Sequence, residues 1–113
     1  MKIKQREVGG VVILDCKGWL TLGEGDEALK AAIAQLMTAD KKQVLLNLAD
    51  VPYMDAAGLG ETERSLTTVR RQNGDLKLLS LTKRIQDLLV ITKLMSRFET
   101  FDDEAKALAS FTD

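Results

Sequence analysis

Val44-Leu45-Leu46-Asn47-Leu48 begins the stretch that decides the fold of this chain, and the stretch ends with Tyr53-Met54-Asp55-Ala56-Ala57-Gly58-Leu59-Gly60. Its first part is a nearly continuous apolar run, which is typical of a central β-strand covered on both faces. Asp55 stands directly before a segment of helical periodicity, where a carboxylate accepts hydrogen bonds from the free N–H groups of the first helical turn. The stretch therefore predicts a buried strand, a turn, and a helix that begins with an acidic cap.

Short strands are predicted on both sides of this unit. Residues 3–8 and 11–16 flank Gly9-Gly10, which favours a β-hairpin. The first of these strands is expected at a sheet edge, because Lys2, Lys4 and Arg6 fall on one of its faces. Residues 76–79 predict a fourth strand, and residues 98–101 predict a short last one.

Helices are predicted between the strands and at the end of the chain. The first has an apolar stripe at helical spacing, made of Leu29, Ala32, Ile33, Leu36 and Met37. The second spans residues 56–73, with Gly74 as a left-handed cap, and the third spans residues 83–92. Asp102 or Asp103 is expected to cap a final helix that carries Ala105, Leu108 and Phe111. The expected fold is one α/β domain over residues 1–113, a mixed β-sheet of about four to five strands with about four helices packed on it.

The composition excludes several classes of function. The chain of 113 residues has a net charge of −1, which argues against a general nucleic-acid surface. It has no histidine and one cysteine, so imidazole catalysis, an internal disulfide and the usual zinc sites are not expected, and we predict no metal and no cofactor. No apolar run approaches the roughly 18 residues of a membrane span. With no apolar core of a signal peptide in residues 1–7, we expect a cytoplasmic protein without membrane insertion, as a monomer or weak dimer.

The segment Asp55-Ala56-Ala57-Gly58-Leu59-Gly60 resembles the Asp-Ser-Ser-Gly-Leu-Gly signature of STAS domains, the family of bacterial anti-sigma factor antagonists. The resemblance extends over nearly the whole chain and implies the STAS fold, a small sheet surrounded by about four helices. It also implies that the chain is a non-catalytic binding module. The chain would bind a serine-kinase anti-sigma factor, in competition with a sigma factor. In that family the kinase phosphorylates the second serine, and Ala57 occupies the position here. Either the natural chain remains in the unphosphorylated form, or serines have been replaced by alanine.

The expected partner surface lies around the start of the helix at residue 56. At about 100° per residue, Ala57, Glu61, Arg64 and Thr68 fall along one line, opposite the apolar residues Leu59 and Leu66, and are expected to face solvent. Glycines 58 and 60 are expected to keep that surface low. The predicted partner-binding residues are Asp55, Ala56, Ala57, Gly58, Gly60, Glu61, Arg64 and Thr68.

The loop after the second strand departs from the family in a second way. Where STAS domains often have Gly-Glu-Leu-Asp, this chain has Gly18-Trp19-Leu20-Thr21. Trp19 is the only tryptophan, and it either covers the sheet edge as part of the core or stands exposed as a binding anchor. Nucleotide binding by this loop is not expected, because residues 23–26 carry two carboxylates and no phosphate-binding lysine.

Two other functions remain open. The second hypothesis, after the anti-sigma factor antagonist, is a STAS subunit of a membrane transporter or of a multiprotein signalling complex. A small enzyme with Asp55 as its nucleophile is the third hypothesis. A carboxylate that caps a helix is stabilised as an anion and needs no catalytic explanation, so we predict that the chain is not an enzyme.

Overall fold

A computed structural model describes residues 1–112. The strands are β1 (Lys2–Val8), β2 (Val11–Lys17), β3 (Gln43–Asp50), β4 (Asp75–Leu79) and β5 (Thr100–Phe101). The helices are α1 (Gly25–Thr38), α2 (Ala56–Arg71), α3 (Lys83–Ile91) and α4 (Glu104–Ala109), with a 3₁₀ turn η1 (Met95–Arg97) after α3. The predicted α/β architecture is confirmed.

The five strands form one mixed sheet in the order β1-β2-β3-β4-β5. β1 and β2 are an antiparallel hairpin, and its turn residues Gly9 and Gly10 both have positive φ angles, which explains the glycine pair. All later neighbours are parallel, so each connection between them crosses over a face of the sheet. β1 lies at one edge of the sheet, as its lysines predict, and β5 lies at the other.

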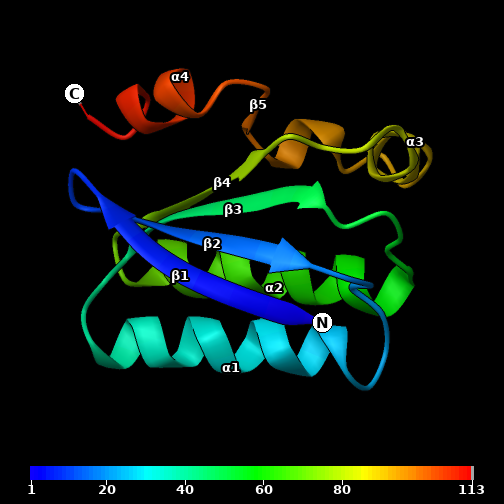
Figure 1. Ribbon diagram of the computed structural model, residues 1–113, viewed down its shortest axis with the longest axis horizontal. Helices are drawn as coiled ribbons and strands as arrows, with labels where there is room; N and C mark the ends of the chain where they lie inside the picture. Colours follow the sequence, from blue (N-terminus) through cyan, green and yellow to red (C-terminus); the bar gives the residue numbers. More distant parts are fainter. Residues whose placement is uncertain (113) are drawn as a thin grey trace.

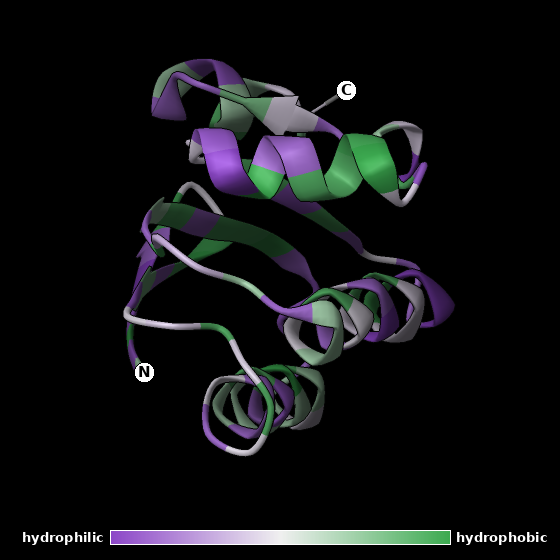
Figure 2. Ribbon diagram, turned by 90° about the vertical axis from the view of Figure 1, so that its right-hand side faces the viewer, coloured by the Kyte–Doolittle hydropathy of each residue, from purple (hydrophilic) through white to green (hydrophobic). Residues whose placement is uncertain are grey.

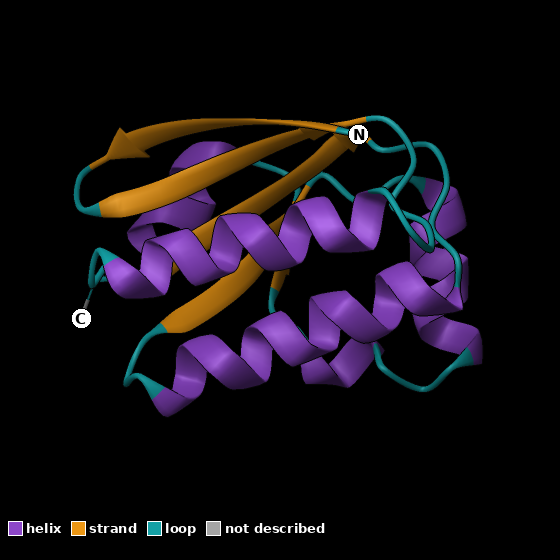
Figure 3. Ribbon diagram, turned by 90° about the horizontal axis from the view of Figure 1, so that it is seen from below, coloured by secondary structure: helices purple, strands orange, loops and turns teal. Residues whose placement is uncertain are grey.

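Helices cover both faces of the sheet (Figure 1). α1 and α2 lie side by side beneath one face (Figure 3), and the larger core fills the space between them and the strands. α4 covers the opposite face, where Ala107 packs on Val11, Ile13, Leu45 and Leu79. This second layer explains why β3 is apolar on both faces, as its continuous run predicts.

The end of α2 differs from the prediction. The helix stops at Arg71, and Asn73, with φ of 65°, is the left-handed residue rather than Gly74. Gly74 donates its N–H to the carbonyl of Val69 and passes close to the backbone of Lys42, where any Cβ would collide with the Lys42 carbonyl oxygen. The glycine therefore serves chain packing, while the asparagine takes the left-handed conformation.

In the final helix, one of the two predicted cap residues is the cap, and the buried residue is not one of those predicted. The side chain of Asp103 accepts from the backbone N–H of Ala105, so Asp103 is the cap. Ala107 is the buried residue of α4, whereas Ala105 is exposed and Phe111 lies beyond the end of the helix. The helix is shorter than its apolar pattern predicts.

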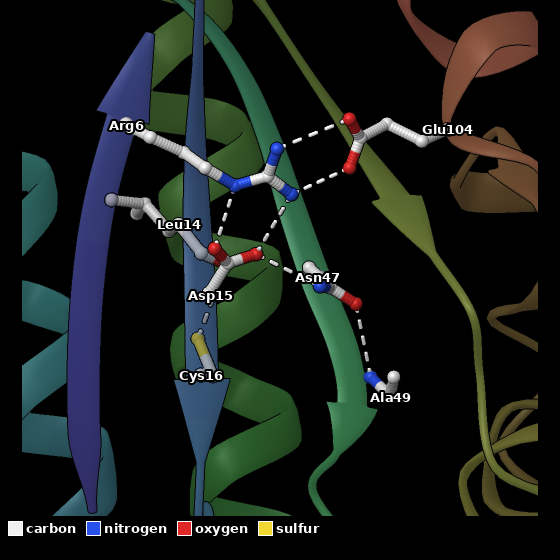
Figure 4. Close-up of polar contacts among 7 residues, drawn as sticks. All are labelled: Arg6, Leu14, Asp15, Cys16, Asn47, Ala49 and Glu104. Carbon is white, nitrogen blue, oxygen red and sulfur yellow. Dashed lines mark hydrogen bonds and ion pairs between the residues drawn. The ribbon is translucent and has the colours of Figure 1, made fainter.

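Arg6 links β1, β2 and α4 on the outer face of the sheet (Figure 4). Its guanidinium donates to both carboxylate oxygens of Asp15, at 2.7 and 3.2 Å, and to both oxygens of Glu104. Asn47 on β3 donates to the same Asp15 carboxylate at 2.8 Å. Hydrogen bonds from Arg6 hold the pKa values of Asp15 and Glu104 below the usual range of carboxyl groups.

Replacing Arg6 by methionine is expected to lower the free energy of unfolding by about 1 kcal/mol at neutral pH and low salt, because two partly exposed ion pairs are lost. Lowered pKa values contribute stability above the ordinary carboxyl pKa of about 4, and that stability disappears as pH falls through the folded-state values. The difference from the wild type should therefore shrink in acid and in high salt. Urea unfolding followed by circular dichroism measures it, and Lys2→Met is the control. Equal stability of Arg6→Met and the wild type at pH 7 would contradict the prediction.

Candidate functional site

The start of α2 lies at the end of the sheet where β2 and β3 finish, and Figure 2 faces this end of the molecule. Two loops meet there, the one after β2 and the one after β3. Leu20 and Met54 form an isolated parallel bridge between them, and the N–H of Leu20 donates to the carbonyl of Tyr53 at 3.0 Å. The loops therefore continue the pairing of the sheet up to the first turn of the helix.

Asp55 caps α2, as its position in the sequence predicts. One carboxylate oxygen accepts from the N–H of Gly58 at 2.8 Å, and the other accepts from the N–H of Leu22 at 3.0 Å. These two backbone hydrogen bonds lower the pKa of Asp55, that of Gly58 having the larger effect. The carboxylate thus joins the helix to the loop after β2 and stays ionised at neutral pH.

Gly58 is buried, which corrects the expectation that it keeps an outer surface low. A Cβ at this position would collide with the carbonyl oxygen of Leu20. At Gly60 the nearest atom to an added Cβ would be a guanidinium nitrogen of Arg64 at 3.4 Å, the end of a flexible side chain. Only the first glycine is required by the packing of the helix against the loop.

The tip of the helix is accessible. Ala56 is exposed, and Ala57 and Gly60 are half-buried, so neither loop covers the start of the helix. Neither alanine has an oxygen that could carry a phosphoryl group. The tip offers a small, neutral surface beside a capped helix N-terminus.

Glu61 does not face solvent, and the prediction for this residue is wrong. The residue is 7% exposed and lines a hollow shared with Lys30 and Ile33 of α1. Its carboxylate accepts from Arg64 at 3.3 Å and from the Ser65 hydroxyl at 3.4 Å. The burial follows from the packing of α1 alongside α2 (Figure 3). Arg64 and Thr68 are exposed, as predicted.

The sequence leaves open whether Trp19 belongs to the core or is exposed, and in the structure it is exposed. It is 62% exposed, and its ring packs against Tyr53 with ring centroids 5.4 Å apart. Arg84 lies on the first turn of α3, and its guanidinium lies over the Tyr53 ring, 4.3 Å from the ring centroid. Sequence reasoning missed Tyr53 and Arg84, since the two residues meet only through the fold.

Other chemistry is sparse in the described part of the chain. Residues 1–112 contain no cluster of three histidine, cysteine, aspartate or glutamate side chains able to hold a metal ion. Cys16 is buried, as predicted, and its burial raises the thiol pKa to about 12. None of the helices in residues 1–112 combines the length and apolar composition that crossing a membrane requires.

A family model matches the sequence that folds into this order of strands and helices. The model of the STAS domain matches residues 2–107. The chain belongs to the STAS domain family. The family that the segment from Asp55 to Gly60 resembles is thereby confirmed.

Three relatives place the chain within the family. BtrV of Bordetella bronchiseptica, named as a candidate anti-sigma factor antagonist, is 23% identical over 111 residues, which cover 98% of this chain and 95% of that protein. The phosphorylated form of the Bacillus cell fate determinant SpoIIAA matches with a TM-score of 0.76 at 16% identity, covering 98% of this STAS chain and all of SpoIIAA. A sulfate transporter family protein from Wolinella succinogenes matches with a TM-score of 0.78 at 23% identity, covering 91% and 85%. At these identities the two structures show the STAS fold alone.

Gly58→Ala is expected to destabilise the domain by roughly 1–3 kcal/mol, because a Cβ has no space beside the Leu20 backbone. Gly60→Ala is the matched control two residues further along the helix, where space is available and alanine gains up to about 1 kcal/mol of helix propensity. Thermal unfolding of both variants measures the difference. Equal melting temperatures for the two variants would show that the contact with Leu20 does not constrain the helix.

Asp55→Ala is expected to cost about 1 kcal/mol of unfolding free energy at neutral pH, through loss of the cap. A lowered pKa means that this contribution is present above pH 4 or so and is lost as pH falls through the folded-state value. Wild type and variant should therefore converge in acid, and Asp55→Asn, which keeps an acceptor oxygen, should lose less. Denaturant titrations at several pH values test this. A constant difference across the pH range would refute an ionised cap.

Proposed function

We propose that this STAS protein is an anti-sigma factor antagonist, which binds a serine-kinase anti-sigma factor through the tip of α2 and thereby frees a sigma factor. The observation that carries the proposal is an accessible helix tip formed by Ala56, Ala57 and Gly60. The resemblance of this segment to the family signature implies that Ala57 stands where the family has its phosphorylated serine. The names of relatives such as BtrV support it. Sequestering the kinase would act on transcription indirectly, in the cytoplasm, with no direct contact to nucleic acid.

The proposed contact surface has a rigid centre and an adaptable side. Asp55, Ala56, Ala57 and Gly60 form the centre, and the cap together with the contact of the buried Gly58 with Leu20 holds it in place. Arg64 and Thr68 extend it along the exposed side of α2. Glu61 contributes by holding the Arg64 guanidinium rather than by touching a partner.

The absence of a hydroxyl at residue 57 gives the proposed complex a regulatory property. In a phosphorylatable protein, a phosphate at the tip adds a charge of about −1.5 to −2 and breaks such an interface by repulsion and bulk. Ala57 has no oxygen to form the phosphoester. The complex of this chain with its kinase would therefore lack that release step.

A phosphorylation assay tests the function and the switch together. Each anti-sigma factor kinase encoded in the source genome is purified and incubated with ATP and the wild type, Ala57→Ser or Ala56→Ser. A cognate kinase is expected to bind the wild type stably and to add one phosphate, seen by intact mass, to Ala57→Ser alone. Ala56→Ser is the matched control for position. Phosphate on the unaltered protein would place the regulated residue elsewhere, and absence of binding to every kinase would refute the function.

The Wolinella succinogenes match favours one alternative, a STAS subunit of a transporter or of a larger signalling complex. The same tip would then contact a different ATPase or scaffold. Affinity capture with the wild-type chain separates the two hypotheses, because a histidine-kinase-like ATPase and a transporter component are readily distinguished by mass spectrometry.

A further inference from the structure

Two hollows beside the helix tip adjoin at Tyr53 and Arg84, which line both of them. The first, of about 480 Å³, lies over Trp19, Tyr53 and Arg84. The second, of about 360 Å³, runs between the start of α2 and α3 and shares Tyr53 and Arg84 with the first. We call the two hollows together the tip groove. Its lining includes Trp19, Tyr53, Arg84, Asp87, Leu88 and Ile91. Figure 2 shows the two helices that contribute to this lining, α3 above and the end-on start of α2 below.

The two ends of the tip groove are apolar and strongly exposed. Trp19 at one end is 62% exposed, and Ile91 at the other is 79% exposed. Leu88, one turn before Ile91, is half-buried and continues the apolar wall of the second hollow. Single exposed apolar residues need no explanation, but a tryptophan and an isoleucine at opposite ends of one groove are typical of an interaction surface.

The middle of the tip groove holds one uncommitted positive charge. The guanidinium of Arg84 is fixed by stacking on Tyr53, and no carboxylate in residues 1–112 lies within ion-pair distance of it. The groove's own carboxylates are engaged elsewhere. Asp55 accepts from two backbone N–H groups, and Asp87 pairs with Lys83 at 3.3 Å. A guanidinium that lies over an aromatic ring keeps its N–H groups free in its own plane, where two of them can donate parallel hydrogen bonds to one carboxylate.

We propose that the tip groove binds a segment of the partner kinase in which a carboxylate side chain lies between two apolar side chains. The carboxylate pairs with Arg84, one apolar side chain packs on Trp19 and Tyr53, and the other packs on Leu88 and Ile91. The hydrogen-bonding groups select this chemistry. Both oxygens of Asp55 already accept backbone N–H groups, whereas the Arg84 guanidinium donates to no carboxylate in residues 1–112 and lies between two apolar ends. The inference rests on the proposed function and specifies which part of the kinase this chain recognises beyond the alanine tip.

The test uses the full chain and the kinase that binds it in the phosphorylation assay. Calorimetric titration compares the dissociation constants of the wild type, Arg84→Glu and Trp19→Ala. Both variants are expected to weaken binding at least about tenfold, the first by opposing like charges and the second by removing a large aromatic contact. Lys106→Glu on α4 and Val8→Ala on the hairpin are matched controls for charge and for exposed apolar area, and both should stay within about twofold. Circular dichroism verifies that each variant is folded.

A second measurement reports the groove directly. Trp19 is the only tryptophan, so a chain labelled with 5-fluorotryptophan gives one ¹⁹F resonance, which should shift on kinase binding. Kinase binding with an unmoved resonance, or with an unchanged or improved affinity of Arg84→Glu, would overturn the inference and leave the proposed function standing. Self-association that Arg84→Glu abolishes would identify a second copy as the occupant and overturn it as well. If no kinase binds the wild type, the proposed function fails and the inference fails with it.

Discussion

The contact between Gly58 and the backbone of Leu20 is the constraint on which the geometry of the site depends. It brings the first turn of α2 so close to the loop after β2 that no side chain fits between them. At that distance the Asp55 carboxylate reaches the Leu22 N–H as well as its own helix, and Leu20 pairs with Met54 and Tyr53. The helix tip is therefore part of a rigid junction rather than the free end of a helix, and a partner that binds it meets a preformed surface.

The opposite side of the sheet is held together by a different kind of interaction. There the apolar layer is small, and two cations fasten the C-terminal segment to it. Arg6 connects α4 to the hairpin, and the buried Lys77 on β4 donates to the carbonyl and hydroxyl oxygens of Ser110 and pairs with Glu99 at 3.0 Å. The Lys77 ammonium also lies 4.7 Å from the centroid of the Phe111 ring. Polar contacts of this sort need one exact arrangement, so they fix the position of a short helix that burial alone would hold loosely.

The periodicity of the sequence predicted the features that depend on residues close together in the chain. It failed for the features that depend on the packing of segments far apart in the chain. The strands, the order of helices and the Asp55 cap follow from local pattern, because burial on one or both faces leaves a period in the sequence. Glu61 lies on the predicted line of α2, yet α1 covers it, and the sequence does not state at which angle two helices pack. The sequence predicts that Gly58 keeps an outer surface low and that Gly74 caps α2. In the structure both positions require glycine because the backbone passes close to Leu20 and to Lys42. The stacking of Arg84 on Tyr53 likewise requires the fold before it can be recognised.

The chemistry of the tip separates recognition from reaction. A reactive carboxylate needs a free oxygen and a partner that moves a proton, whereas both oxygens of Asp55 accept backbone hydrogen bonds that favour the ionised form. The alanines add no nucleophile, and the exposed groups around them are an aromatic ring, a stacked guanidinium and aliphatic side chains. Groups of this kind bind through shape, apolar area and one charge, and they change little with pH near neutrality. A surface built in this way responds to the presence of its partner rather than to modification, so the amount of partner would set how much of the protein is engaged.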